Sequence, residues 1–297
     1  RYQEVHGKLF TSTEAAAYKS SNVMDQWIVS LSQSLIKFVK DEMAAYRLYT
    51  VIPKLVSFID QLTNWYVRMN RKRLKGDSGD QDWLASLTTL FDVLYLVCRT
   101  MAPFTPFLTE TMYQSLRLFV PEDQREESVH YLMIPDYDAS RVNESIERAV
   151  SSMQSVIETG RTLRDRKSVG LKYPVAEYAV CHLDDQFIQD VNGLVSYVLQ
   201  ELNAKKITFV QEVKNFMKVS ATADSKALGP RFKTKLKDIV KAINDLSHDD
   251  VVKLLKEGSV TVVGENIKLD DIKINRTFTG DASVYEAQTT ADNALVL

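Results

Sequence analysis

Apolar residues recur every three or four positions through much of the first 120 residues, and this spacing restricts that part of the chain to amphipathic helices. One stripe starts after Asn22, a typical helix N-cap, and Asp25 lies in the favourable first turn. A second helix is predicted from Leu48 to Met69, with a kink or break at Pro53, which lacks a backbone N–H.

Two more helices complete this pattern. One is predicted from Trp83 to Met101, and the next has Thr105 as its cap and Pro106 at its first position, ending near Phe119. Residues 22–120 are therefore predicted to form a helical bundle.

The pattern becomes mixed after the bundle. An extended segment is predicted at 129–134 and a helix at 141–166, and short strand-like runs then alternate with helices. The strands are expected at 175–180, 206–210, 216–219, 260–263 and after 267, with helices at 184–202, 231–246 and 248–257. The predicted fold is mainly α, with a connector at 1–21, a helical bundle at 22–140, a linking helix at 141–170 and a smaller α+β module at 171–297.

The second helix carries an apolar and a basic stripe side by side. Phe58, Leu62, Trp65 and Met69 share one face, and a second set with the same spacing, Asn64, Arg68, Arg71 and Lys75, shares another. Arginines in such a row suit phosphate oxygens, because each guanidinium can bond two of them. An exposed helix face paired with acids on neighbouring helices would look the same.

Two further basic clusters allow two interpretations each. Arg164 and Lys167 end a predicted helix, where cations also favour the helix dipole. The run from Gly229 to Lys237 resembles an exposed arm that could reach a phosphodiester backbone, and plain solubility is the alternative. Net charge is −2, so any preference for a polyanion comes from clustering alone.

The sequence contains no recognisable catalytic or metal-binding pattern. Cys98 and Cys181 are far apart, which favours free thiols in a reducing compartment, and Cys181-His182 lacks the second ligand pair of a zinc site. The apolar runs are too short to suggest a membrane span, and the polar start without an initiator Met suggests part of a longer protein.

Several motifs resemble one family. Asn22-Val23-Met24-Asp25-Gln26-Trp27-Ile28 resembles the first anticodon-binding helix of class Ia aminoacyl-tRNA synthetases, and Ala102-Pro103-Phe104-Thr105-Pro106-Phe107 resembles their helix junction. Residues 62–74 (Leu-Thr-Asn-Trp-Tyr-Val-Arg-Met-Asn-Arg-Lys-Arg-Leu) resemble the isoleucyl version of this domain. Residues 128–131, and 163–167 with 171–174, are similar to the eukaryotic and archaeal isoleucyl form specifically.

The resemblance implies a class Ia anticodon-binding bundle whose parent enzyme uses ATP and Mg²⁺ in the cytoplasm to attach isoleucine to tRNA(Ile). The family signatures His-x-Gly-His and Lys-Met-Ser-Lys-Ser do not occur here, so no catalytic residue or cofactor is expected in this region. The expected partner is tRNA(Ile), and other synthetases or a scaffold protein are the alternative. A complete small enzyme is the third hypothesis. The predicted tRNA-binding residues are Asn64, Arg68, Arg71, Lys72, Arg73, Lys75, Arg164, Lys167, Arg231, Lys233 and Lys235.

Overall fold

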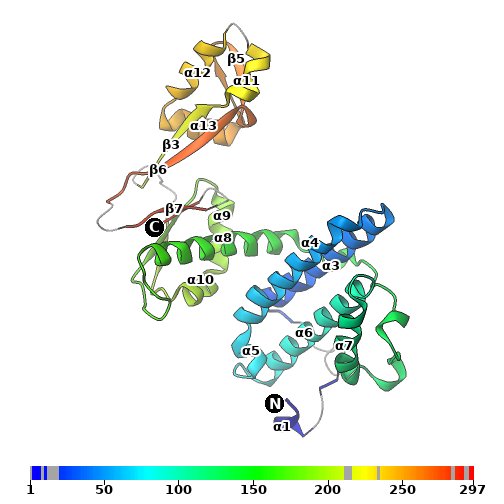
Figure 1. Ribbon diagram of the computed structural model, residues 1–297. Helices are drawn as coiled ribbons and strands as arrows, with labels where there is room; N and C mark the ends of the chain where they lie inside the picture. The colour runs from blue at the N-terminus through cyan, green and yellow to red at the C-terminus, as the bar shows by residue number, and fades with distance from the viewer. Residues whose placement is uncertain are drawn as a thin grey trace. The chain divides into compact units, whose positions relative to one another are not determined.

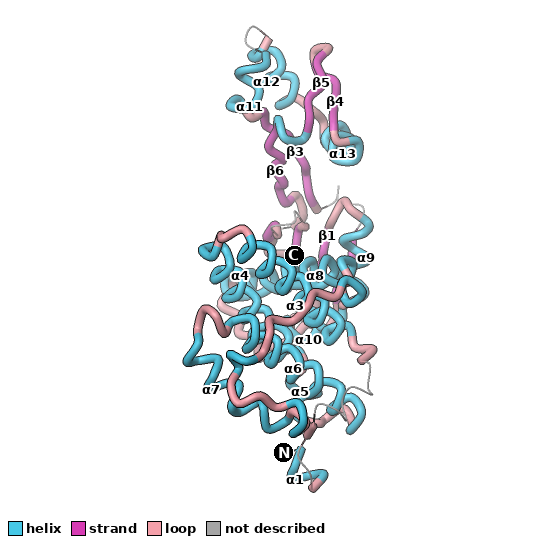
Figure 2. Tube along the Cα trace, turned by 90° about the vertical axis from the view of Figure 1, so that its right-hand side faces the viewer, coloured by secondary structure: helices cyan, strands magenta, loops and turns pink. Residues whose placement is uncertain are grey.

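The computed structural model describes residues 2–7, 10–11, 20–210, 216–232, 235–281, 285–290 and 294–297. The chain divides into two compact units, Arg1–Arg148 and Ala149–Leu297 (Figure 1). In the part of the chain that the structure describes, every strand lies in the second unit, and the first unit is built from helices and loops (Figure 2). The chain therefore has the predicted architecture of a helical bundle and a smaller α+β part.

The first unit contains six α-helices among its described residues. They are α1 Tyr2–His6, α3 Val23–Ala44, α4 Leu48–Asp60, α5 Arg71–Lys75, α6 Asp80–Met101 and α7 Pro106–Leu116. A π-helix, η1 (Gln61–Val67), joins α4 to α5. Short 3-10 turns follow α7, namely η2 Arg117–Phe119, η3 Glu122–Gln124, η4 Val129–Tyr131 and η5 Ala139–Arg141.

The predicted helix starts are confirmed. Asn22 caps α3, because its side-chain Oδ1 accepts a hydrogen bond from the Met24 amide at 2.9 Å. Pro106 is the first residue of α7, where its missing N–H removes no helical hydrogen bond. Thr105 occupies the cap position of α7, but its hydroxyl donates to the Met101 carbonyl rather than accepting from the new helix.

The second predicted helix differs from the structure in where it is interrupted. The α4 helix continues through Pro53, and the chain reverses instead before Leu48, where Tyr46 adopts a left-handed conformation with φ of 57°. Pro53 is the sixth residue of α4, in its second turn, so it removes one helical hydrogen bond, and the helix tolerates this loss. The widening to a π-helix over Gln61–Val67 was not predicted, since the side-chain pattern hardly distinguishes the two helix types.

The core of the first unit is formed by the inner faces of α3, α4, η1 and α6. Its fully buried side chains include Met24, Ile28, Leu35, Ile36, Leu55 and Tyr66. By length and hydropathy α6 could span a bilayer, but half of its most apolar window is buried inside the protein. It packs against α3, α5 and α7, so its apolar residues serve the bundle core.

The extended segment predicted at 129–134 is only partly found. Val129 to Tyr131 form η4, with Ser128 as its cap, and the backbone becomes extended at Leu132, with φ of −90° and ψ of 137°. Leu132 to Pro135 are not part of a strand. Val129 is buried and packs against Cys98 and Tyr113. One buried apolar residue thus explains the hydrophobic signal without a sheet.

The second unit begins within helix α8, Glu144–Arg166. Its other helices are α9 Asp185–Gly193, α10 Val195–Leu202, α11 Ser225–Phe232, α12 Leu236–Asn244 and α13 His248–Glu257, with the 3-10 turn η7 at Leu269–Asp271. Its strands are β1 Tyr178–Cys181, β2 Ile207–Val210, β3 Met217–Ala223, β4 Ser259–Val262, β5 Glu265–Lys268, β6 Ile272–Phe278, β7 Gln288–Thr289 and β8 Leu295–Val296.

The described strands form three small sheets. The largest has the order β2-β1-β8-β7, in which β1 runs parallel to β2 and antiparallel to β8. The parallel pair is connected through α9 and α10, so these elements form a βαβ unit within the α+β module. Antiparallel pairs β3–β6 and β4–β5 make up the other two sheets.

Two predicted helices of this unit are each split in two. The helix expected at 184–202 breaks between Gly193 and Val195, and the one expected at 231–246 is interrupted before α12. A predicted strand boundary was more accurate, since β2 ends at Val210 as expected. The last helix, α13, has the predicted bounds and a capping box between Ser247 and Asp250.

Candidate nucleic-acid interface

The basic stripe predicted for the second helix lies on the protein surface. The exposed residues are Asn64, Arg68, Arg71, Lys72 and Lys75, which we call the basic face. The four residues of the predicted apolar stripe, Phe58, Leu62, Trp65 and Met69, are all buried. The separation of the two faces therefore follows the periodicity of the sequence.

Three cations of the basic face remain available to a ligand. No acidic side chain pairs with Arg71, Lys72 or Lys75 within the described part of the chain. Asn64 differs, because its side-chain amide donates to Asp60 one helical turn earlier. The end of α5 thus presents positive charge that no acid among the described residues neutralises.

Arg73 has a structural role and lies inside the bundle. Its side chain is only 11% exposed, and its guanidinium bridges Asp25 of α3 and Asp82 of α6. Nη1 donates to Asp25 at 2.9 Å and to Asn70 at 2.7 Å. Nη2 donates to Asp25 at 2.8 Å and to Asp82 at 2.6 Å. Nε donates to Asp82 at 2.8 Å. All five N–H donors of the guanidinium are therefore engaged.

This arrangement contradicts the prediction that Arg73 contacts RNA. A buried cation with every donor engaged cannot also bind a phosphate. Asn70 is also buried, and its side-chain amide donates to the Tyr66 carbonyl at 2.9 Å. Sequence spacing could not identify this exception, because Asp25 and Asp82 lie 48 and 9 positions from Arg73.

The ion-pair network joins three helices at the base of the basic face. Asp25 is 1% exposed and also accepts a hydrogen bond from the Tyr66 hydroxyl at 2.7 Å. Burial, together with the neighbouring Asp25 carboxylate, raises the pKa of Tyr66 above its usual value. Burial alone lowers the pKa of Arg73, but the hydrogen bonds that it donates to Asp25 and Asp82 outweigh that effect and the net change is upward. Both groups therefore keep their protonated forms at neutral pH.

The second predicted cluster is divided by the structure. Arg164 is 3% exposed, and its Nη atoms donate to the backbone carbonyls of Gly170, Tyr173 and Leu202. It ties the end of α8 to two loops, so the prediction that it contacts tRNA is wrong. Lys167 is exposed, and its ammonium pairs with Glu286 at 2.9 Å.

The third cluster does not form the predicted exposed arm. Gly229 and Pro230 lie inside helix α11, and Arg231 near its end pairs with Asp271 at 2.6 Å. Lys235 pairs with Glu265 at 2.7 Å, and Lys233 lies outside the described residues. The described cations of this cluster are thus partly neutralised by acids of their own unit.

The cysteines and histidines show no arrangement for catalysis or metal binding. Cys98 and Cys181 are buried free thiols, and burial raises the pKa of each to about 11. His182 stacks on Phe187, with 4.3 Å between ring centroids, and accepts from the Asp184 amide. Among the described residues, no three His, Cys, Asp or Glu side chains are grouped closely enough to hold a metal ion.

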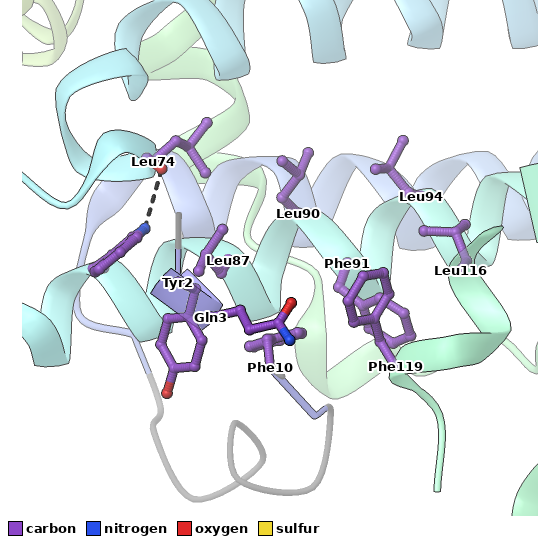
Figure 3. A pocket seen from close by; sticks show the side chains of 11 residues that line it. Tyr2, Gln3, Phe10, Leu74, Leu87, Leu90, Phe91, Leu94, Leu116 and Phe119 are labelled. Atoms are coloured by element: carbon purple, nitrogen blue, oxygen red, sulfur yellow. Dashed lines mark hydrogen bonds between the residues drawn. The ribbon is translucent and has the colours of Figure 1, made fainter. Parts of the chain in front are cut away.

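An apolar pocket of about 450 Å³ lies beside the end of α5 in the first unit (Figure 3). The side chains that line it are Tyr2, Gln3, Phe10, Leu74, Trp83, Leu87, Leu90, Phe91, Leu94, Leu116 and Phe119. The polar groups of its lining include the Tyr2 hydroxyl, the Gln3 amide and the Trp83 Nε1–H, and the last donates to the Leu74 carbonyl at 3.1 Å. The pocket therefore offers apolar contact and no arrangement of groups for chemistry.

Comparison with known proteins places this architecture in a family. Residues 25–179 match the anticodon-binding domain of tRNA ligase. The chain is 45% identical to the cytoplasmic isoleucine–tRNA ligase of Mus musculus, covering 97% of this chain and 23% of that protein. It is 44% identical to a probable cytoplasmic isoleucine–tRNA ligase of Dictyostelium discoideum, covering 96% of this chain and 27% of the relative.

A yeast relative gives the same result. The cytoplasmic isoleucine–tRNA ligase of Saccharomyces cerevisiae is 39% identical, over 94% of this chain and 27% of its own length. The chain thus spans about a quarter of the length of the curated relatives it matches. With its helical bundle, its basic face and this match over residues 25–179, the chain belongs to the anticodon-binding domain family of tRNA ligases, on the isoleucine–tRNA ligase branch.

Proposed function

We propose that this chain recognises the anticodon arm of tRNA(Ile) through the basic face. The observation that carries the proposal is the exposure of Arg71, Lys72 and Lys75 without acidic partners in the described chain, on a helix that the buried Arg73 network locks to the bundle. A polyanion releases counterions when such cations bind its phosphates, and this release supplies much of the affinity. Because the cations are held on a rigid helix, little conformational entropy is lost on binding.

We propose the parent activity on the strength of the relatives. The chain would act within an isoleucine–tRNA ligase of the cytoplasm, as the curated relatives are named. The catalytic signatures of the family do not occur in this sequence, and its described side chains form no metal-ligand cluster. ATP and Mg²⁺ would therefore be used by the remainder of the parent enzyme, and this region would bind RNA without a cofactor and without performing chemistry.

Direct binding measurements test the tRNA proposal. The 297-residue chain is titrated with a tRNA(Ile) transcript at several salt concentrations, and the slope of log K against log salt gives the number of phosphates neutralised. Arg71→Ala, Lys72→Ala and Lys75→Ala should each weaken binding and reduce the slope by about 0.7–0.9.

The matched control removes an exposed lysine elsewhere. Lys253→Ala removes the same charge from α13, where the side chain is exposed and close to Glu257. Its affinity and salt slope should stay at wild-type values. Equal effects from Lys253→Ala and Lys75→Ala would mean that net charge alone matters, and the basic face would lose its assigned role.

Docking of other synthetases or a scaffold protein stays a prediction for residues 171–297. The full chain, used as bait with purified synthetases, tests it. Recovery of no synthetase would argue against this second role.

A further inference from the structure

Helix α4, η1 and α5 follow one another, and we call this run of helices the rod. The basic face lies toward its C-terminal end, and an exposed apolar surface lies at its N-terminal end. Tyr46, Leu48, Tyr49, Ile52 and Val56 are all solvent-exposed, and we call them the apolar end. Tyr46 is 91% and Tyr49 is 77% exposed. Single exposed hydrophobic side chains are common, but here five lie within eleven residues of the chain, and such clustering is typical of binding surfaces.

The apolar end and the basic face lie along the same run of consecutive helices, α4, η1 and α5. From Tyr49, exposed positions continue at steps of three or four residues through Ile52, Val56, Asp60, Asn64, Arg68, Arg71 and Lys75. Helix α4, the π-helix and α5 follow one another with only a short break (Figure 1). At 1.5 Å per residue, the face from Tyr49 to Arg71 extends over roughly 30 Å, enough to contact several nucleotides at once.

The turn before α4 holds Tyr46 in a costly conformation. Its φ of 57° lies in the left-handed region, which costs a residue with a Cβ about 1–2 kcal/mol. Hydrogen bonds fix the turn, since the Tyr46 and Arg47 amides donate to the Met43 and Glu42 carbonyls at 3.1 and 2.9 Å. Backbone strain of this kind persists where the surrounding structure imposes it, often at binding sites.

A side-chain clamp makes the turn rigid. The Glu42 carboxylate accepts hydrogen bonds from Arg47 Nε at 2.9 Å and from the Thr50 hydroxyl at 2.6 Å. The pairing also neutralises Glu42, so its charge repels an approaching phosphate less. The clamp therefore fixes the backbone that carries two solvent-exposed tyrosine rings, and it leaves little net charge beside them.

We propose that Tyr46 and Tyr49 form a platform on which unpaired bases of the bound RNA stack, with Ile52 and Val56 extending its apolar surface. The inference rests on the proposed function, since it takes the phosphates of the same RNA to be held by Arg71, Lys72 and Lys75. Bases stack on aromatic side chains regardless of sequence, and RNA loops present such unstacked bases. A stable protein partner would need about 800 Å² on this side, more than five side chains provide.

Substitutions at the platform separate stacking from charge. The full chain carrying Tyr49→Ala or Tyr46→Ala is titrated with a tRNA(Ile) transcript that contains 2-aminopurine in the anticodon loop. Loss of one stacked base weakens affinity roughly 5- to 150-fold. The salt slope stays at its wild-type value, because no phosphate contact is removed. The change in 2-aminopurine fluorescence on binding is reduced.

Conservative variants and a control complete the experiment. Tyr49→Phe keeps the ring and should bind like wild type, whereas Tyr49→Leu keeps an apolar side chain without a ring and should bind weakly. Phe107→Ala removes a ring that is 89% exposed on α7, and its affinity should not change. Circular dichroism confirms that each variant is folded.

Each alternative outcome decides one question. Wild-type affinity in both Tyr→Ala variants, with weaker binding by Arg71→Ala, rejects the platform and leaves the proposed function in place. Full affinity in Tyr49→Leu rejects stacking. Tyr→Ala variants that bind RNA normally but lose a protein partner assign the apolar end to protein docking. A wild-type chain that binds no tRNA(Ile) rejects the proposed function as well.

Discussion

Replacing Arg73 by methionine should destabilise the first unit strongly. The substitution keeps an unbranched side chain of similar length but removes five N–H donors, and it leaves Asp25 buried without its cation at 1% exposure. Breaking a buried ion pair by deleting one partner costs about 3–5 kcal/mol, because the remaining charge stays desolvated. Asp82 is partly exposed and recovers much of its hydration, so Asp25 accounts for most of the loss.

Intrinsic fluorescence measures this loss in the first unit alone. The three tryptophans, Trp27, Trp65 and Trp83, all lie in this unit and are buried. Urea unfolding followed at tryptophan emission therefore reports on the bundle, even though a chain of two units need not unfold in one step. For an m-value of about 2 kcal/mol/M, the midpoint should fall by about 1.5–2.5 M urea.

A double-mutant cycle gives the sharpest test of this reasoning. The double variant Asp25→Asn/Arg73→Met should lose about 1–3 kcal/mol less free energy of unfolding than the sum of the losses in the two single variants. The reason is that Asp25→Asn removes the buried charge that Arg73→Met leaves unpaired. Arg71→Met is the control: it should change stability by less than about 0.5 kcal/mol while weakening tRNA binding. The reasoning is refuted if Arg73→Met lowers the midpoint no more than Arg71→Met, or if the cycle is additive.

Three further predictions concern other parts of the molecule. Gly76→Ala should lower the free energy of unfolding by more than the roughly 1–2 kcal/mol that a left-handed backbone conformation costs alanine, because the new Cβ would also lie 2.8 Å from the Trp83 ring. A loss below about 1 kcal/mol in the same urea assay would contradict this. The hydrogen bond from Arg47, and after it the one from Thr50, lowers the pKa of Glu42 to about 2. The stabilising contribution of Glu42 is therefore present above its unfolded pKa of about 4.3 and is lost as the pH falls toward 2. An NMR titration that gives Glu42 an ordinary pKa in the wild type, or the same pKa in Arg47→Gln, would refute the clamp. Burial raises the pKa of Cys98 and Cys181 to about 11, so iodoacetamide at pH 8 should label neither thiol in the native chain and both in urea, as mass spectrometry can show; rapid native labelling would place a thiol at the surface.

Most of the helices could be predicted because their signals are local. The cap at Asn22, the proline at Pro106 and the spacing of buried residues on α3 and α6 act within one or two turns of each element. Interruptions were harder to predict. Pro53 proved compatible with a continuous helix. The chain reversal at Tyr46 depends on a clamp between Glu42 and Arg47, and no residue typical of turns indicates it in the sequence.

The basic face also has features that the sequence could predict and features that depend on tertiary contacts. Periodicity separated Asn64, Arg68, Arg71 and Lys75 from the buried stripe, and the structure keeps all four on the surface. It could not separate Arg73 from its neighbours, since the acids that bind it come from α3 and α6. Arg164 was misjudged for a similar reason, because its acceptors are carbonyls of loops up to 39 positions away.

The sequence by itself therefore determined which faces of the helices are apolar, where most helices begin and which family the motifs resemble. Hydrophobic periodicity and capping depend only on neighbours a few residues apart, so a linear pattern contains them. Tertiary structure alone decided which cations face water and which are locked into the core. An arginine is the same residue in both settings, and only the side chains that folding brings to it determine whether its charge is available to RNA.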